Sequence, residues 1–375
     1  MRVPLAWSNT IQNKWRTLAS ASGICFAILL IFMQLGFLAA AKKNVSIVYR
    51  FLDFDIIITS KGYLSLTRAL EINPYRIIQT RNLPGILSAT GLLVDRGGWK
   101  NQKTNRSKSC MIIGLDSSDA SFLKGEAAQQ MPLISRPYTT LVDRKSHDAY
   151  GSREVGGLAM VNGTPLEIRG EYNMGLGLLA DGSIIVNPLT FKRLFGMASN
   201  NVHMGLVKVA PGVTPEKAME TIRAALPPDV RMLTRRQIIE REQRYFIKVK
   251  PLGIIFQVAA FVGFIIGSVI LYQVLSSEIS KRLNEFATLK AIGYTNSYLY
   301  MVGIKQGLIM SFMGYIPALI FSHFLYNMVE SLTKVPTAMG LYRAVFVLLL
   351  SLAMCGFASV LALQKVKKAD PAELY

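Results

Sequence analysis

Four long apolar stretches constrain this chain more than any other feature of its sequence. Each exceeds the roughly 18 residues that separate a membrane-spanning helix from a buried core helix. Only 17% of the residues are charged, whereas a soluble domain carries about a quarter. We therefore predict an integral membrane α-helical protein, with four transmembrane helices over residues 19–41, 251–275, 301–328 and 344–363.

The first apolar stretch has a second interpretation. Ala39 to Ala41 resembles the cleavage site of a secretory signal peptide, but the apolar part of a signal is only about 7 to 15 residues long. The run ASASGICFAILLIFMQLGFLAAA is much longer, which favours a retained helix. Upstream, residues 1–18 combine Trp7 and Trp15 with basic and amide side chains. This segment is therefore expected to be an amphipathic, cytoplasmic segment at the lipid headgroups.

Residues 42–250 separate the first two spans, and their composition is that of a folded domain. Thr214 is expected to cap a helix that begins at Pro215, and Pro227 with Pro228 is expected to end it. A strand precedes this helix and another follows it, and this order predicts an α+β domain. The strand-like runs cover residues 53–60, 109–115, 182–187, 203–209 and 229–233.

Two further stretches of this domain are expected to lie outside its strands. The polar, glycine-containing residues 85–109 are expected to form a mobile loop. The run NMGLGLLADG (173–182) loosely suggests a nucleotide-binding loop, but no strand and helix start frame it, so a surface turn is favoured.

Enzymatic motifs are absent from the sequence. It contains no GxxxxGK[ST], HExxH or GxSxG motif, so we expect no catalytic residues and no cofactor bound by this chain. Three scattered cysteines and three scattered histidines predict neither a disulfide framework nor a metal site. If ATP is used, a partner subunit must bind the ATP and Mg²⁺.

Basic residues next to the spans predict the orientation of the chain. They gather after the second span and after the fourth, at Lys281, Arg282, Lys290, Lys365, Lys367 and Lys368. Basic loops stay in the cytoplasm, so both termini, residues 276–300 and the tail 364–375 are predicted to be cytoplasmic. The domain 42–250 and the loop 329–343 are then extracytoplasmic.

The net charge of +19 also raises the question of nucleic-acid binding. The basic residues are dispersed, and no stripe of them alternates with aromatic residues. Attraction to anionic lipids or to an acidic partner is therefore favoured, and no nucleic-acid partner is expected.

Small and polar residues inside the spans predict helix packing. Gly263 and Gly267 lie one helical turn apart, the spacing that lets two helices approach closely. We expect a homodimer contact there, with incidental glycine, common in membrane helices, as the alternative. Gln34, Gln257, Gln306 and His323 are expected to form interhelical hydrogen bonds rather than a proton relay.

The segment between the second and third spans predicts an amphipathic helix. In SSEISKRLNEFATLKAIGYTNSYL (276–299), apolar residues recur every three or four positions and Gly293 provides a C-terminal cap. Such a helix can dock into a groove of a cytosolic protein and pass its movement to both spans. A helix resting on the headgroups is the alternative. The candidate coupling residues are Glu278, Ile279, Arg282, Leu283, Glu285, Phe286, Leu289, Lys290 and Gly293.

The string EFATLKAIGY resembles the signature of FtsX/MacB-type permeases. The tail KKADPAELY resembles their C-terminal motif, with Tyr375 where many members carry Arg. LAWSNTIQNKWRTL, DVRMLTRRQIIEREQRYF and VILYQVLSSEIS resemble the DevC branch, the permeases of the heterocyst glycolipid exporter, so the resemblance covers nearly the whole chain. The string KRLNEF departs from this pattern at Arg282 and Phe286, where His or another polar residue and Tyr are expected. This departure bears on which ATPase is cognate.

The resemblance implies a MacB/FtsX-like (type VII ABC) architecture and a homodimer in the cell inner membrane. It also implies a cytosolic ABC ATPase subunit, a periplasmic membrane-fusion adaptor and a TolC-like outer-membrane channel. The implied mechanism is mechanotransmission, in which ATP-driven closure moves the second span and its helical extension from Thr234 to Lys250. The cargo would be a glycolipid or another amphiphile, taken up outside the cytoplasm.

Two other classes of function remain open. An FtsX-like regulator would control an extracytoplasmic cell-wall hydrolase instead of exporting cargo. A membrane enzyme would need an active site in the outer domain, where the sequence identifies none.

Overall fold

The structure is a computed structural model of the 375-residue chain. It describes residues 14–175, 180–249, 252–281, 296–333 and 339–368. The chain divides into two compact units. The helical unit comprises Met1–Ala40, Gly253–Glu330 and Thr337–Tyr375, and the sheet unit comprises Ala41–Leu252 with Ser331–Pro336.

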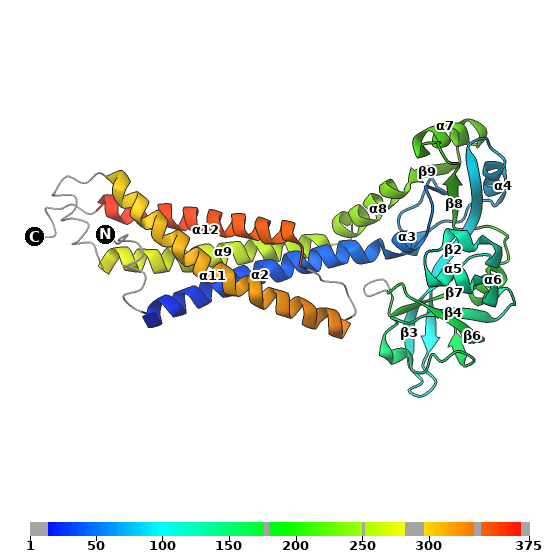
Figure 1. The fold of residues 1–375 in the computed structure, drawn as a ribbon, viewed down its shortest axis with the longest axis horizontal. Helices are drawn as coiled ribbons and strands as arrows, with labels where there is room; N and C mark the ends of the chain where they lie inside the picture. Colours follow the sequence, from blue (N-terminus) through cyan, green and yellow to red (C-terminus); the bar gives the residue numbers. More distant parts are fainter. Residues whose placement is uncertain (1–13, 176–179, 250–251, 282–295, 334–338, 369–375) are drawn as a thin grey trace, which may run out of the picture. The chain divides into compact units, whose positions relative to one another are not determined.

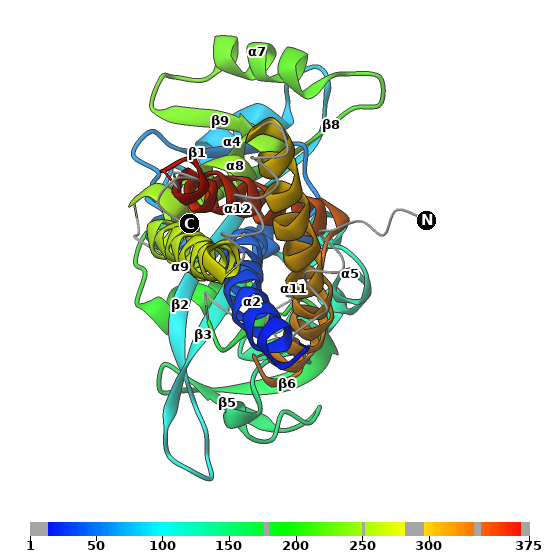
Figure 2. The same cartoon turned by 90° about the vertical axis from the view of Figure 1, so that its left-hand side faces the viewer.

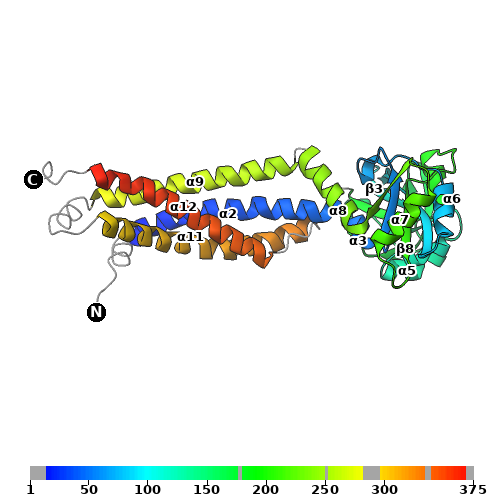
Figure 3. The same cartoon turned by 90° about the horizontal axis from the view of Figure 1, so that it is seen from above.

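The helical unit contains all or most of each apolar helix. These helices lie side by side, with α2 between α9 and α11 (Figures 2 and 3). These helices are α2 (Lys14–Val45), α9 (Leu252–Lys281), α11 (Asn296–Thr333) and α12 (Leu341–Lys368). All four are long and apolar enough to cross a membrane, so the prediction of four spans is confirmed. The α9 helix continues past the predicted span end at residue 275 and reaches Lys281.

Apolar side chains lie both inside and outside this bundle. Its core includes Ile28, Phe32, Leu271 and Met354. The outward faces are apolar as well: on α9, Ile254, Val258, Phe261 and Ile265 are exposed. A bundle in water would place polar residues on these faces. The all-round apolar surface is that of helices surrounded by lipid.

The sheet unit is an α+β domain, as predicted, and it lies in the sequence between the first and second apolar helices (Figure 1). Its sheet has the strand order β3-β7-β4-β6-β5-β2-β8-β1-β9 among the described residues. The strands are β1 (Ile56–Ser60), β2 (Ile86–Lys100), β3 (Ser107–Gly114), β4 (Thr139–Asp143), β5 (Leu158–Val161), β6 (Thr164–Tyr172), β7 (Gly182–Val186), β8 (Met204–Val209) and β9 (Val230–Thr234).

Short helices connect the strands. The α-helices are α3 (Ile47–Phe51), α4 (Tyr75–Arg81), α5 (Glu126–Gln130), α6 (Pro188–Phe195), α7 (Pro215–Ala225) and α8 (Arg235–Arg244). The 3-10 turns are η1 (Leu66–Arg68), η2 (Ser117–Phe122), η3 (Met131–Ile134) and η4 (Asp148–Tyr150), and η5 (Tyr245–Val249) is a π-helical turn that continues α8.

The predicted strand–helix–strand unit near the end of the domain is present as β8, α7 and β9. The Thr214 hydroxyl accepts a hydrogen bond from the Lys217 backbone N–H, and Pro215 is the first helical residue. Strands β8 and β9 both pair antiparallel with β1, which lies between them. They therefore run parallel to each other, as a crossover through a helix requires.

The prediction of a loop over residues 85–109 is wrong. Most of this stretch forms β2, which pairs first with β8 and then with β3. Glycine occurs inside this strand where neighbouring side chains leave no room for a Cβ atom. At Gly97, for example, a Cβ would lie 2.7 Å from the Ile112 side chain. Only the tip turns, where Asn105 has a φ of 57°.

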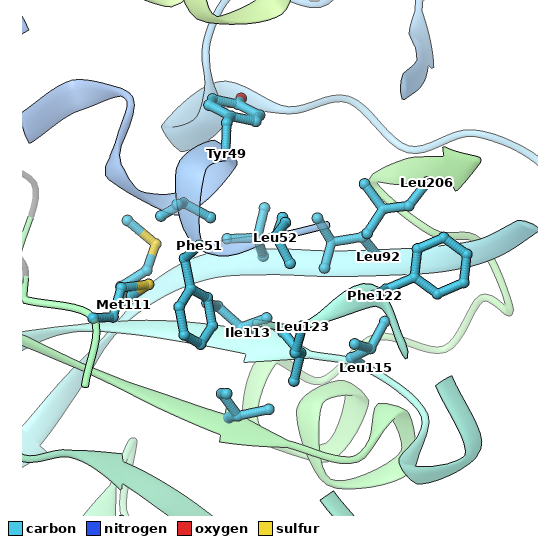
Figure 4. Close-up of a cluster of buried hydrophobic side chains, with 14 of the residues drawn as sticks. Tyr49, Phe51, Leu52, Leu92, Met111, Ile113, Leu115, Phe122, Leu123 and Leu206 are labelled. Carbon is cyan, nitrogen blue, oxygen red and sulfur yellow. The ribbon is translucent and has the colours of Figure 1, made fainter. Parts of the chain in front are cut away.

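The sheet unit has a core built from elements far apart in the sequence (Figure 4). Tyr49 and Phe51 of α3 pack in it with Leu92 of β2 and Ile113 of β3. The short helix that follows α2 is therefore anchored in the domain core.

Candidate functional site

The α3 and α8 helices contact each other in the sheet unit, and each is joined in sequence to an apolar helix. The α3 helix follows α2, and α8 with η5 precedes α9. The Arg235 backbone N–H donates to the Asp55 carbonyl at 3.0 Å, and its guanidinium donates to the Arg50 carbonyl at 3.0 Å. The Gln243 amide donates to the Lys42 carbonyl at 3.1 Å. Both connections to the helical unit are thus tied together inside the sheet unit.

The α8 helix begins with a reciprocal cap. The Gln237 backbone N–H donates to the Thr234 hydroxyl at 3.3 Å, and the Thr234 N–H donates to the Gln237 side chain at 2.9 Å. These bonds satisfy donors that a helix start leaves free. The cap fixes where the helix begins, so Ile238 and Glu242, four residues apart, share the buried face.

Glu242 is the central residue of this contact, which we call the α3–α8 junction (Tyr49, Tyr63, Leu66, Arg241 and Glu242). Its carboxyl is buried, with 1% of the residue exposed. Oε1 accepts hydrogen bonds from the Tyr63 hydroxyl at 2.7 Å, the Leu66 backbone N–H at 2.6 Å and the Tyr49 hydroxyl at 3.5 Å. Oε2 has no hydrogen-bond partner among the described residues.

Burial dominates the electrostatics of the junction. It raises the pKa of Glu242 to about 7, although the hydrogen bonds from Tyr63, Leu66 and Tyr49 and the charge of Arg241 favour the ionised form. Burial also raises the pKa of Tyr49 and of Tyr63 well above the usual value. The phenols therefore stay neutral donors, and Glu242 is the group that can gain or lose a proton near neutral pH.

Glu242 was not among the predicted site residues, because it lies in the highly charged run RRQIIEREQR. Such a run predicts a solvated helix face. A signal was present in the spacing, because Glu242 lies four residues after Ile238 and four before Phe246, which packs against the core. Helical periodicity therefore places the carboxyl on the apolar side.

Two of the candidate coupling residues lie in the described part of α9. Ile279 is 3% exposed and belongs to the bundle core. The Glu278 carboxylate accepts a hydrogen bond from the Gln306 amide of α11 at 3.0 Å. In this structure both side chains therefore hold α9 against its neighbours, and their role in ATPase coupling stays a prediction. The other candidates lie outside the described residues: Arg282, Leu283, Glu285, Phe286, Leu289, Lys290 and Gly293.

The glycine pair of α9 packs within the same chain. A Cβ at Gly263 would lie 3.1 Å from Ile31 of α2, and one at Gly267 would lie 2.5 Å from Met354 and 3.0 Å from Ala27. Small residues thus allow close approach of helices here. Residues of α2 and α12 pack against these glycines, and the homodimer contact stays a prediction.

The polar residues of the spans have separate roles. Gln306 bonds to another helix through Glu278, whereas His323 contacts Asn327 of its own helix at 3.4 Å. Gln257 is exposed and Gln34 is half-buried. Within the described residues, no group of three or more His, Cys, Asp and Glu side chains could hold a metal ion.

Comparison with known proteins bears chiefly on the helical unit. Residues 257–371 match the family model described as FtsX-like permease C-terminal. No curated protein sequence matches the chain.

Two solved structures resemble the chain distantly. The extracellular domain of the noncanonic ABC-type transporter YknZ from Gram-positive bacteria is 11% identical, with a TM-score of 0.36, and the match covers 48% of this chain and 98% of that chain. The periplasmic region of MacB from Actinobacillus actinomycetemcomitans is 12% identical, with a TM-score of 0.38, covering 51% and 94%. The family match covers most of α9 together with α11 and α12, so this part of the chain is similar to an FtsX-like permease domain.

Proposed function

We propose that this chain is the permease subunit of an ATP-driven ABC exporter. The observation that carries the proposal is the FtsX-like permease match over residues 257–371, which coincides with the last three of four helices suited to a bilayer. The chain itself has no phosphate-binding loop, so a separate cytosolic ATPase would bind ATP and Mg²⁺.

The proposed assembly is a homodimer in the inner membrane. Both termini are cytoplasmic and the sheet unit is periplasmic, following the basic residues near the span ends. The sheet unit would work with a membrane-fusion adaptor and a TolC-like channel, on a glycolipid or other amphiphile. These components come from the resemblance to the DevC branch.

Mechanotransmission is the proposed mechanism. Two observations support it, one in each unit. The Glu278–Gln306 hydrogen bond and the burial of Ile279 couple the end of α9 to α11, so a push on residues 282–295 would reach both helices. In the sheet unit, the α3–α8 junction ties the two connecting segments together.

The test replaces one residue in the apolar stripe of the proposed coupling helix. Leu289→Asp places a charge in an apolar contact and should cost about 2 to 5 kcal/mol of docking. Each 1.4 kcal/mol is about tenfold in affinity, so ATPase capture should weaken at least tenfold. Gly293→Val should leave capture largely intact but lower ATP turnover, because a β-branched residue resists the left-handed cap.

The measurements are ATPase pull-down and reconstituted ATP turnover, with the amount of inserted protein as control. Asn284→Asp adds the same charge off the apolar stripe and should leave capture unchanged. Full ATPase association with Leu289→Asp would mean that the segment only rests on headgroups. Co-purification of a cell-wall hydrolase in place of an adaptor would favour the regulatory alternative.

A further inference from the structure

A groove in the sheet unit lies beside the α3–α8 junction and is not used by the proposed transport mechanism. Its volume is about 640 Å³, within the range of small-ligand sites. The α8 helix and η5 form one wall, and Leu64, η1 and β9 form the other. The lining residues are Leu64, Arg68, Leu233, Gln237, Glu240, Arg241, Arg244, Tyr245, Lys248 and Val249.

Positive charge dominates the polar half of this groove. Arg68, Arg244 and Lys248 are exposed, and no carboxylate among the described residues forms an ion pair with them. Arg241 is already held in place, since its guanidinium donates to the Tyr63 carbonyl at 2.8 Å. Glu240 is the only acid in the lining, and its carboxylate is paired outside the groove with Arg236 at 3.1 Å.

Apart from Gln237, the rest of the lining is apolar and exposed or half-buried. Leu64 is 47% exposed and Val249 is 65% exposed, while Leu233 and the Tyr245 ring are half-buried. Cations and apolar side chains on one concave surface match a ligand that has an anionic head and an apolar body. A free phosphate would leave the apolar part unused, and a neutral detergent would leave the cations unpaired.

The position of the groove in the sequence favours one such ligand. Only residues 250–251 separate η5 from α9, a helix suited to span a bilayer. Phospholipid is the anionic amphiphile that a membrane supplies at the end of such a helix. We infer that this groove binds the headgroup region of an anionic phospholipid through Arg68, Arg241, Arg244 and Lys248, with Leu64 and Val249 against its first acyl carbons.

Photo-crosslinking tests this site directly in the full chain. The probe is phosphatidylglycerol with a diazirine near the top of one acyl chain, added to protein in dodecyl maltoside, and cross-linked peptides are mapped by mass spectrometry. Cross-links are expected in the peptides containing Leu64 and Val249. Unlabelled phosphatidylglycerol should compete at least about tenfold better than phosphatidylcholine, because only its headgroup has a net negative charge.

Two double variants separate this groove from general attraction of the basic protein to lipid. Arg244→Gln with Lys248→Gln removes two exposed groove cations and should weaken labelling of these peptides roughly tenfold. Lys217→Gln with Arg223→Gln removes the same charge from exposed positions of α7 outside the groove and should leave labelling unchanged.

Three outcomes would overturn the inference. The first is equal competition by phosphatidylcholine, and the second is equal labelling of the two double variants. The third is full competition by hexaglutamate at the same charge concentration, which would identify the groove as a site for an acidic polypeptide. The inference does not depend on export, so failure of the ATPase experiments would leave it standing.

Discussion

At the residue scale, Glu242 is a buried carboxyl whose two oxygens have unequal numbers of hydrogen bonds. One carboxyl oxygen receives three donors, whereas the other has no partner among the described residues. A buried carboxyl group with hydrogen bonds to only one of its two oxygens favours the protonated form. The contact between α3 and α8 should therefore become weaker as the pH rises through neutrality.

Glu242→Gln tests this dependence on pH. Because the pKa of Glu242 is raised to about 7 in the folded state, its stabilising contribution is complete below the usual value of 4.5 and is lost as the pH rises through about 7. Gln keeps the acceptor and does not titrate. From about pH 5 to about pH 8, wild type should lose on the order of 3 kcal/mol in free energy of unfolding relative to Glu242→Gln.

Thermal unfolding of the full chain, followed by circular dichroism across this pH range, measures the difference. Glu240→Gln removes a carboxylate from an exposed position of the same helix and controls for the loss of charge. The same pH dependence in both variants would assign the effect to general electrostatics and not to burial.

At the element scale, local signals predicted some parts of the fold and failed for others. The β8–α7–β9 unit was predictable because Thr214, Pro215 and the paired prolines mark the helix ends by local chemistry. The strand β2 was not predictable, because part of its pairing is with β8, which lies far along the chain, and another part is with β3, the strand that follows it. Polarity and glycine content alone made it resemble a loop.

The same limit applies to the candidate site. The sequence predicted a helical extension before the second span, and α8 and η5 are helical there. It could not predict that Tyr49 and Tyr63 meet Glu242, because residues nearly two hundred positions apart are brought together by the sheet. Likewise, Ile279 is buried in a cluster with residues of α2, α11 and α12, which no local pattern specifies.

Helix packing in the bundle can be tested at Gly267. In Gly267→Ile the new Cβ would lie 2.5 Å from the Met354 side chain and 3.0 Å from the Ala27 side chain. Overpacking of this kind costs typically about 1 to 3 kcal/mol, so the melting temperature in detergent should fall. Gly356→Ile is the matched control on α12, because a Cβ there meets nothing within 4 Å. Equal melting temperatures for the two variants would contradict the packing described here.

At the scale of the whole molecule, the membrane character was the most predictable property. A span needs only length and apolarity, and both are properties of the sequence itself. Orientation is different, because it depends on how loop charges interact with the membrane during insertion. The direction of the chain therefore stays a prediction that needs a chemical test.

Accessible cysteines supply this test. In a chain with Cys25, Cys110 and Cys355 replaced by Ala, Lys103→Cys lies at the exposed tip between β2 and β3. An impermeant maleimide should label it in intact cells stripped of their outer membrane. Asn284→Cys, in the segment predicted to be cytoplasmic, should react only after the membrane is permeabilised. The reverse pattern would invert the topology and remove the basis for export.

The pairing of β1 with β9 has a mechanical consequence. The segment that enters the sheet unit through α3 leads into β1, and the segment that leaves it through α8 follows β9. Ile56 pairs with Thr234 at the same end of both strands. A force that draws the entering and leaving segments apart therefore opens the β1–β9 hydrogen bonds from that end, one after another. It does not load all of these bonds at once in shear. Because β9 is an edge strand, it can peel away while the other strands stay paired. The bonds from Arg235 to Asp55 and from Gln243 to Lys42 would bear such a force first, and they set the tension at which peeling begins.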